Sequence, residues 1–461
     1  RTGAVGDGAG GVHHAGGKGD VHHVFLGHRV KVVTDLDLHG GAVHGDGGLR
    51  RGGGGELGGD LLIDLRDGQA VGADLVTVDV QIDGRIALTE AGARVGEALG
   101  VVDHLDDLVA QCGDGLGVGA VDLDGEAAAE LAGEILHSAD LDGAGALFDA
   151  GHRIVQGGWY FGDSSLVDED VLAKIREVAP LAPLHNNPEA NVIEFCLEQY
   201  PDLPNVTVYD TAFHFNMPEV AKTYALPKDV CDKLHIRKYG AHGTSYRYIS
   251  KKVAEMTNGE ARKVVVCHIG SGASLCAIED GKCMDTTMGL TPLDGVMMGT
   301  RCGSIDPATV CYLQREGGYS YQEVDDMMNK QSGLLAISGI SNDARDIRTR
   351  ASEGDERCLL AFDMFAYKAM QQAGSMIASM AGVDTITFTA GIGENDWSIR
   401  KGFCDCFEWL GVRIDNNRNR EAVGNGPQVI SAAGSAVTVM VIPTDEEYMI
   451  AHDVERLTKN N

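Results

Sequence analysis

Four predicted strands in the second two-thirds of the chain end in polar or glycine-rich turns, and ligands of α/β proteins gather beyond such strand ends. The most distinctive of these stretches reads K-V-V-V-C-H-I-G-S-G over residues 263–272, where a buried strand (Val264–Cys267) leads into the turn His268–Gly272. Glycines in such a turn let backbone N–H groups come close to a bound anion. We therefore interpret this turn as part of a phosphate site.

Asp210 follows a second predicted strand, Val206–Tyr209, in the stretch Y-D-T-A-F-H. A carboxylate at the end of a strand can hold Mg²⁺ or orient a nucleophile. The same residue type also caps helices, because its side chain accepts hydrogen bonds from the first N–H groups. The spacing alone favours neither interpretation.

Arg301 lies in the stretch M-G-T-R-C-G-S-I-D-P (298–307), where small neighbours leave its guanidinium group unobstructed. The planar, forked group suits a carboxylate or a phosphate. A surface salt bridge is the commoner role of an arginine, but the glycine setting favours anion binding here. His152-Arg153, before V-Q-G-G at 155–158, repeats the pattern more weakly.

Three further stretches carry signals of the same kind. His242 lies between glycines in G-A-H-G-T-S, which favours a donor to an anion over a core or capping histidine. Gly391–Asn395, after the strand Thr385–Phe388, resembles a backbone nest for a nucleotide, although a hairpin or a helix entry would look similar. Glu446 and Glu447 open a predicted helix, where acids favour the helix dipole in any case. Together these stretches indicate anion and metal chemistry.

Several other functions lack their sequence signatures. No Gly-Lys pair is followed by Ser or Thr, so there is no Walker A motif, and neither H-E-x-x-H nor G-x-S-x-G occurs. The net charge of −30, without a basic patch, argues against a nucleic-acid partner. No apolar run approaches the length of a membrane span, and the eleven cysteines include no C-x-x-C pair. We expect a cytoplasmic protein without membrane or nucleic-acid partners.

The composition changes abruptly near Gly151. Residues 1–150 contain no Pro, Asn, Met, Tyr or Trp, and they hold 34 of the 62 glycines and 26 acidic against 9 basic residues. The segment is either an unusual acidic domain or a sequence read in a wrong frame or strand and joined to a genuine protein. We favour the misread frame, because the break is abrupt; an intact, translated single frame would contradict it. Within this segment, Leu75–Val80 alternates like a strand and Gly125–His137 is helix-like.

The elements that must position the chemical residues alternate between strands and helices. Helices are predicted over Asp168–Val178, with acids in its first turn, and over Cys358–Ala381, which has few helix breakers. The strand Thr385–Phe388 follows the long helix, and another strand, Val437–Ile442, precedes Glu446. This alternation predicts an α/β protein.

The residues above belong to a longer series of motifs, in order, that closely resembles the acetate kinases over residues 151–461. The matching text is G-H-R-I-V-Q-G-G (151–158), L-A-P-L-H-N (181–186), Y-D-T-A-F-H (209–214), R-K-Y-G-A-H-G-T-S (237–245), H-I-G-S-G (268–272), M-G-T-R-C-G-S-I-D-P (298–307), S-G-I-S-N-D-A-R-D (338–346), T-A-G-I-G-E-N (389–395) and V-I-P-T-D-E-E (441–447). The resemblance implies Mg²⁺-dependent, reversible phosphoryl transfer between ATP and acetate, giving acetyl phosphate and ADP. A propionate or butyrate kinase is a close alternative. It further implies a homodimer.

The resemblance also implies two actin-like (ribonuclease-H-like) α/β kinase domains with a nucleotide cleft between them, the N-terminal one incomplete. We place the remainder of the first domain at 151–212 together with 447–461. The second, nucleotide-binding domain is placed at 213–446, and 1–150 stays an atypical segment.

The resemblance assigns roles to residues that match the family motifs. The expected catalytic residues are Arg153, Asp210, His242 and Arg301. The expected acyl-substrate contacts are Arg153, Val155, Leu184, Phe213 and Arg301. The expected ATP contacts are His268, Gly270, Ser271, Gly272, Asp343, Ala344, Arg345, Gly391, Ile392, Gly393 and Asn395. Glu446 is expected to help hold Mg²⁺.

The sequence departs from the family text at four places. Gln156 replaces a usual His, and Ala241 and Ala344 each replace a usual Phe, but none of these changes removes a charged catalytic group. The family also begins with a strand and an N-x-G-S-S-S-x-K phosphate/metal motif, and nothing in residues 1–150 resembles that motif. We therefore expect strands of the first sheet to be missing, which would leave an open sheet edge. A catalytically impaired, nucleotide-binding remnant is the rival interpretation.

Overall fold

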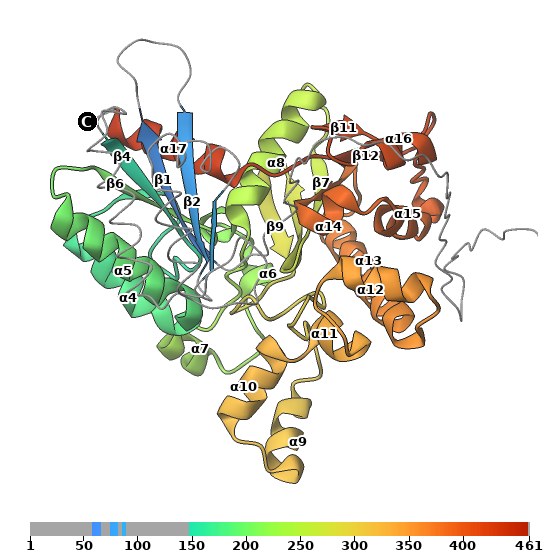
Figure 1. Cartoon of the computed structure of the whole chain (residues 1–461), viewed down its shortest axis with the longest axis horizontal. Coiled ribbons are helices and arrows are strands. Elements are labelled where there is room, and N and C mark those ends of the chain that lie inside the picture. The colour runs from blue at the N-terminus through green and yellow to red at the C-terminus, as the bar shows by residue number, and fades with distance from the viewer. Residues whose placement is uncertain (1–57, 66–73, 82–84, 89–146, 460–461) are drawn as a thin grey trace, which may run out of the picture.

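The computed structural model describes residues 58–65, 74–81, 85–88 and 147–459, and its described strands form two six-stranded sheets (Figure 1). The predicted helix over Gly125–His137 lies outside the described residues. The first sheet is mixed and has the order β3-β2-β1-β4-β6-β5. Its strands are β1 (Gly58–Leu65), β2 (Asp74–Gln81), β3 (Arg85–Leu88), β4 (Leu147–Ile154), β5 (Ser165–Leu166) and β6 (Asn205–Tyr209).

The edge of the first sheet beside β4 is occupied, contrary to the expectation of missing strands. β1 pairs antiparallel with β4, with Leu62 opposite Gly151, and β2 and β3 continue the antiparallel pairing outward. The predicted strand Leu75–Val80 is confirmed as part of β2. Three strands of the atypical segment therefore complete a sheet whose inner half, β4 and β6, is parallel.

The second sheet has the order β11-β12-β10-β7-β8-β9. Its strands are β7 (Lys263–Ile269), β8 (Ala273–Glu279), β9 (Lys282–Thr286), β10 (Thr385–Thr389), β11 (Gln428–Val429) and β12 (Thr438–Val441). β10 is parallel to both β7 and β12, whereas β8 and β9 continue from β7 as antiparallel hairpins. The strand ends that carry the predicted glycine turns therefore meet at one edge.

Helices cover both faces of the sheets at β6 and β7, which is why these two strands are buried along almost their whole length. On β7, Val265 and Cys267 pack toward α13 (Glu356–Ser379), while Val264 and Val266 pack toward α8 (Gly243–Met256). In the first sheet, one face packs on α4 (Glu169–Val178) and α5 (Pro183–Gln199), and the other on α17 (Glu446–Thr458) (Figure 1). The α/β, actin-like architecture predicted from the sequence is confirmed.

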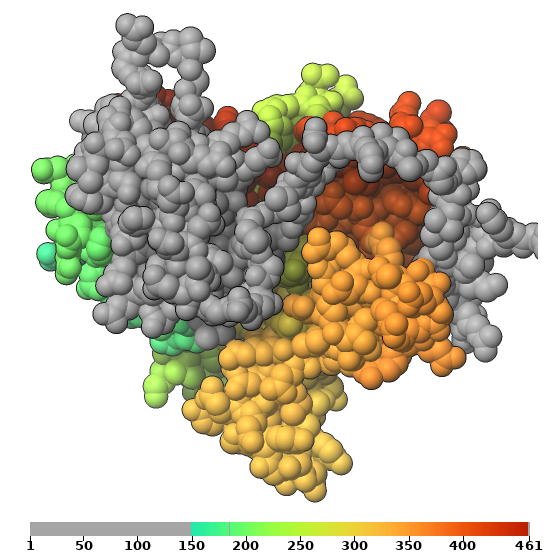
Figure 2. All heavy atoms as spheres, in the orientation of Figure 1, coloured from blue at the N-terminus to red at the C-terminus, as the bar shows by residue number. Residues whose placement is uncertain are grey.

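The remaining helices connect or flank these layers. They are η1 (Ala179–Leu181), η2 (Ala212–His214), α6 (Glu219–Lys222), α7 (Lys228–Leu234), α9 (Ala308–Gly317), α10 (Tyr321–Lys330), α11 (Gly333–Ser338), α12 (Ala344–Ser352), α14 (Ala390–Asn395), α15 (Trp397–Asp405), η3 (Glu408–Leu410) and α16 (Asn416–Glu421). α9 and α10 project from the body of the molecule (Figure 2). No helix in the described ranges has the length and apolarity needed to cross a bilayer.

Predicted elements and observed elements agree closely where caps and periodicity are clear. α4 begins after Asp168, whose side chain accepts a hydrogen bond from Val171 N at 2.8 Å. α13 begins after Asp355, which caps it in the same way, and α17 begins at Glu446 as predicted. Local capping chemistry fixes these boundaries.

Candidate active site

Arg153 and Asp210 form a buried ion pair at the ends of two parallel strands. β4 and β6 are in register, so Asp210 N donates to Ile154 O at 2.9 Å and the two side chains meet just beyond the sheet. Arg153 Nη2 lies 2.7 Å from Asp210 Oδ2, and its Nε lies 3.2–3.3 Å from both carboxylate oxygens. Arg153 is 7% exposed and Asp210 1%, so the pair is largely screened from water.

The beginnings of α8 and α17 reach this pair. Thr244 Oγ1 donates to Asp210 Oδ1 at 3.0 Å, and Gly243 N donates to Asp210 O at 2.9 Å. A Cβ at Gly243 would lie 2.1 Å from Asp210 O, so only glycine permits this approach. Glu446 Oε2 lies 3.8 Å from Arg153 Nε. Of the two roles left open for Asp210, helix capping is not the observed one, because η2 follows Thr211 without a side-chain cap.

His242 and His268 stack and anchor a chain of hydrogen bonds to hydroxyl groups. Their ring centroids are 4.1 Å apart at an interplanar angle of 21°. His242 Nδ1 is 2.7 Å from Ser274 Oγ, and His268 Nδ1 is 2.9 Å from Ser245 Oγ. Ser245 Oγ also accepts from Thr444 Oγ1 at 2.8 Å.

His242 adopts a left-handed backbone conformation (φ 57°) at the position preceding α8, and its side chain makes no cap hydrogen bond. The flanking glycines seen in the sequence are therefore part of a tight turn that aims the imidazole toward β8. Sequence reasoning missed Thr244, Ser245, Ser274 and Thr444. Two of these, in G-T-S after His242, could have been suspected as hydroxyl partners at a helix start.

The turn His268–Gly272 joins β7 to β8 as a hairpin. Gly270 N donates to Gly272 O at 2.9 Å, so this amide is used within the turn. Gly299 N donates to Ser271 O at 3.0 Å, which ties the hairpin to the loop that carries Arg301. The turn is thus held by backbone contacts from two segments.

Gly391–Asn395 belongs to the short helix α14, which is the helix-entry alternative and not an open nest. Because β10 is parallel to β7, with Thr389 opposite His268, α14 begins beside the histidine stack. Ala390 has a left-handed φ of 64°, and Glu394 accepts from Ala390 N at 2.8 Å and from Thr444 N at 3.2 Å. Burial raises the pKa of Glu394.

Asn395 Nδ2 donates to Gly391 O at 2.9 Å within α14, Ile392 packs against the large core of the second sheet, and Gly393 is buried against Cys267 O. These residues therefore shape the helix start.

Arg301 and the start of α12 lie on loops around the hairpin. Arg301 is half-buried and its Nη1 donates to Pro292 O at 3.0 Å. Asp343 caps α12 and pairs with Arg345 Nη2 at 2.5 Å, and this hydrogen bond lowers the pKa of Asp343. Ala344 packs against the core of the second sheet. These contacts hold the loops in place. The predicted contacts of Asp343, Ala344 and Arg345 with ATP stay a prediction.

The other predicted acyl contacts come from three places in the chain: Val155 follows β4, Phe213 lies in η2 and Leu184 lies in α5. Val155 is buried and its N donates to the Glu189 carboxylate at 3.2–3.3 Å. Phe213 is half-buried and packs on the core beneath α8. Leu184 belongs to α5, and its side chain lies outside the described structure.

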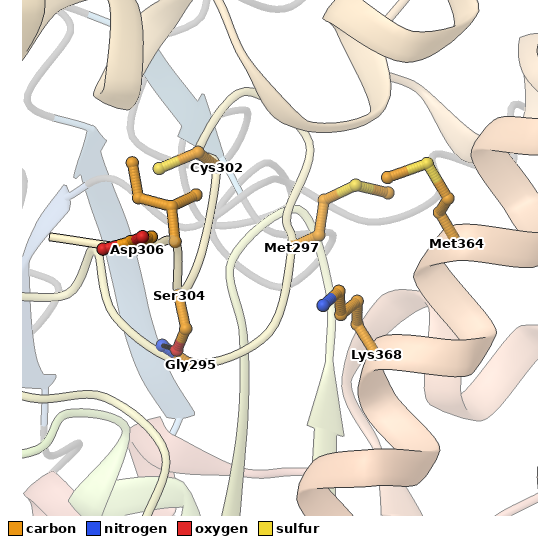
Figure 3. Close-up of a pocket in the computed structure, with 8 residues that line it drawn as sticks. Gly295, Met297, Cys302, Ser304, Asp306, Met364 and Lys368 are labelled. Carbon is orange, nitrogen blue, oxygen red and sulfur yellow. Dashed lines mark hydrogen bonds between the residues drawn. The ribbon is translucent and has the colours of Figure 1, made fainter. Parts of the chain in front are cut away.

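A hollow of about 430 Å³ lies on the side of the Arg301 loop that faces α13 (Figure 3). Met297 and Met364 face one another across it and Lys368 reaches toward it from α13. Its lining residues are Gly295, Met297, Cys302, Ser304, Ile305, Asp306, Met364 and Lys368. Arg301 itself is not among the lining residues, but the later part of its stretch, Cys302 to Asp306, forms one wall of the hollow.

The chain is similar to known proteins over the part that carries these motifs. The model of the acetokinase family matches residues 119–452, beginning before Gly151. The acetate kinase of Heliobacterium modesticaldum is 47% identical over 311 residues, covering 67% of this chain and 78% of that protein. Acetate kinase 2 of Clostridium perfringens is 48% identical over 307 residues, covering 66% and 76%.

Solved structures agree with the sequence relatives. The chain superposes on Porphyromonas gingivalis acetate kinase with a TM-score of 0.71 at 33% identity, covering 88% of this chain and 98% of that one. A propionate kinase from Francisella tularensis gives a TM-score of 0.70 at 35% identity, covering 84% and 93%. Because the family model matches residues 119–452, which is more than half of the chain, this chain belongs to the acetokinase family.

Proposed function

We propose that this chain catalyses Mg²⁺-dependent, reversible phosphoryl transfer between ATP and acetate, giving acetyl phosphate and ADP. The observation that carries the proposal is the cluster of Arg153, Asp210 and Glu446, which three distant stretches of sequence bring together beside the start of α8. The names of the relatives support acetate as the acceptor. We also propose that the protein is a homodimer, as the family resemblance implies, and that it is cytoplasmic.

In the forward reaction, an acetate oxygen forms a bond to the γ-phosphorus of ATP while the bond from that phosphorus to the β,γ-bridging oxygen breaks. Such a transfer needs little covalent participation from the protein, so positioning and charge stabilisation dominate. Arg153 and Arg301 would bind the carboxylate and balance charge on the transferred phosphoryl group. Asp210 would orient Arg153, and His242 would donate a hydrogen bond to a phosphoryl oxygen.

The donor set at this place is compatible with Mg²⁺, which proteins commonly bind through one or two carboxylates together with substrate phosphates. Asp210 accepts hydrogen bonds from Arg153 and Thr244, so Glu446 is the carboxylate that we assign to the ion. When bound, Mg²⁺ would neutralise charge on the nucleotide phosphates. Glu446 lies at the first position of α17 and is thereby held in place.

The nucleotide would occupy the second sheet. We assign its phosphates to the hairpin His268, Gly270, Ser271 and Gly272. We assign its adenosine part to the starts of α12 (Asp343, Ala344, Arg345) and α14 (Gly391, Ile392, Gly393, Asn395). The hydrogen bond between Gly299 and Ser271 places the hairpin next to the Arg301 loop, which supports a single site for both substrates.

Two observations favour alternative functions. The solved propionate kinase relative favours a larger acyl group as a second candidate substrate. The lack of any Asn in residues 1–150, and hence of the N-x-G-S-S-S-x-K motif, favours a catalytically impaired protein that still binds nucleotide.

A coupled assay for acyl phosphate formation separates these readings. The full chain is supplied with ATP, Mg²⁺ and acetate, propionate or butyrate in parallel, and ADP binding is measured by calorimetry. We expect turnover with acetate that Arg301→Ala lowers by about 10²-fold or more. Arg315→Ala, on the exposed face of α9, is the matched control and should leave turnover unchanged. ADP binding without turnover on any acid would contradict the proposal and support the impaired remnant.

A further inference from the structure

A histidine and two cysteines, His214, Cys276 and Cys283, lie together beneath the turn that carries His242. They come from three separate elements, η2, β8 and β9, and their ligand atoms all lie within 4.8 Å of one another. Their exposed fractions are 0%, 0% and 3%. Among the residues that the structure describes, this is the one such group of potential metal ligands.

The hydrogen bonds of His214 determine which of its nitrogens can act as a ligand. Nε2 is 2.9 Å from Ala241 O, and because a carbonyl oxygen only accepts, Nε2 carries the proton. In the neutral ring, Nδ1 therefore presents its lone pair, and it is directed at Cys283 Sγ, 3.0 Å away. A histidine that donates one N–H to a backbone carbonyl and offers the other nitrogen has the arrangement typical of metal ligands in proteins.

The positions of the sulfur atoms suit a small soft cation. Cys276 Sγ and Cys283 Sγ are 3.7 Å apart. Two thiolates bound to Zn²⁺ at about 2.3 Å with tetrahedral angles would be separated by about 3.8 Å. His214 Nδ1 and Cys283 Sγ would have to move apart by about half an ångström to reach their tetrahedral separation. The ring is held during such a change, because Gly240 packs so closely that a Cβ there would lie 2.6 Å from His214 Cδ2.

Access is provided by the edge of the second sheet. β9 is its last strand, five residues long, and the pairing of β8 with β9 shifts register between Ala277 and Ile278. Opening of a short, irregular edge hairpin requires less free energy than opening of the sheet centre. Both cysteines lie in this hairpin, so its local opening would expose them to solvent.

We propose that His214, Cys276 and Cys283 bind one soft divalent cation of the Zn²⁺ class, with Nδ1 and two thiolates as ligands. Binding displaces the thiol proton of Cys276 and the one proton that Cys283 shares with His214 Nδ1, so one M²⁺ is taken up and two H⁺ are released. A water molecule would take the fourth tetrahedral position. Since all three protein ligands are buried and Nε2 stays bonded to Ala241, next to His242, the ion would hold the His242 turn. The site is distinct from the proposed Mg²⁺ position at Glu446.

The test uses the reduced, metal-free full chain titrated with Co²⁺ as the spectroscopic substitute for Zn²⁺. The expected result is a near-ultraviolet thiolate-to-cobalt charge-transfer band that saturates at about one equivalent and disappears when Zn²⁺ is added. This readout ignores binding by the paired histidines near the N-terminus (His13-His14 and His22-His23), because nitrogen ligands alone give no such band. Two protons per metal should be released into a weakly buffered solution.

Variants assign the band to this cluster. Cys276→Ser and Cys283→Ser should each abolish it, and His214→Gln, which keeps an amide donor for Ala241 O, should weaken binding at least tenfold. Cys311→Ser and Cys406→Ser remove thiols elsewhere and should leave the band unchanged. If the cluster variants fail to fold, the wild-type titration and a Zn²⁺-dependent rise in its Tm still decide. Absence of the band, or its persistence in folded Cys283→Ser, would overturn the proposal.

Discussion

At the ends of β4 and β6, the first sheet holds a buried ion pair, whereas at the ends of β7 and β10 the second sheet surrounds the carboxylate of Glu394 with imidazoles, hydroxyls and backbone amides. The former holds the buried Arg153–Asp210 ion pair, with Glu446 close by. The latter holds stacked imidazoles, hydroxyls and a glycine hairpin. In the proposed reaction the first sheet would meet the acceptor carboxylate and the metal, and the second would meet the phosphates through dipoles.

The difference has a physical consequence for how each half fails. Removing one member of a buried ion pair leaves an uncompensated charge, which destabilises the fold as well as the site. Removing a neutral hydrogen-bonding group has a smaller effect on the fold and a more selective one on the ligand. Mutations in the first sheet should therefore change stability and turnover together, and mutations in the second should separate the two.

The largest effect is expected for Arg153→Ala, which strands the Asp210 carboxylate at 1% exposure. The free energy of unfolding in urea should fall by about 3–5 kcal/mol, and kcat for acetyl phosphate formation by about 10²–10³-fold. The control is Arg176→Ala, which removes an exposed pair with Glu194 and should change stability by no more than about 1 kcal/mol. Equal stability losses in the two variants would contradict the proposed difference between the two sheets.

His242→Asn tests the site at the second sheet. Asn tolerates the left-handed backbone at this position (φ 57°), so the imidazole is removed with little strain. We expect kcat to fall by about 10²-fold with the urea midpoint almost unchanged. His235→Asn is matched to it, since His235 also has a left-handed φ (53°) but closes α7 on the surface. A loss of stability in His242→Asn as large as in Arg153→Ala would remove the distinction between the sheets.

We expect His152, beside Arg153 on β4, to make the stability of the protein depend on pH. Burial lowers the pKa of His152 to about 4, although its hydrogen bond with Asn205 opposes the shift. The folded state binds a proton at His152 less tightly than the unfolded state does. The stability that the protein has with His152 buried and neutral is therefore fully present above the unfolded pKa of about 6.5, and it is lost as the pH falls toward 4. It should decrease by about 2 kcal/mol between pH 7 and pH 5.

The measurement is urea unfolding of the wild type and of His152→Gln across this range. The glutamine can keep a hydrogen bond to Asn205 but does not titrate. The difference between the two proteins should therefore narrow with acidification. Parallel pH profiles would show that His152 is not responsible.

The smallest effect is expected for Gly391→Ala at the start of α14. A Cβ there meets no atom of the described residues within 4 Å, so this part of the chain accommodates the change. If the adenosine part of ATP lies against this glycine, KM for ATP should rise about tenfold while KM for acetate stays constant. Gly402→Ala in α15, equally unobstructed, serves as the reference. An unchanged KM for ATP would move the nucleotide away from α14.

How far the sequence could be interpreted depended on whether a signal was local. The caps Asp168 and Asp355 and the runs of buried β-branched residues specify α4, α13, β7 and β10 through short-range physics. The start of α14 was ambiguous, because a glycine-rich turn after a strand fits a nest or a helix equally well. Pairing of β1 with β4 could not be inferred, since strand partners far apart in sequence leave no local trace.

The sequence by itself determined the family, the alternation of strands and helices, and the identity of the charged residues at the strand ends. Only the tertiary structure decided which residues they contact. Asp210 accepts hydrogen bonds from Arg153 and Thr244 instead of capping a helix, and His242 stacks on His268. The tertiary structure also placed His214, Cys276 and Cys283 together. The reason is that parallel strand ends and edge hairpins gather residues by sheet order, and sheet order is set by packing across the whole chain.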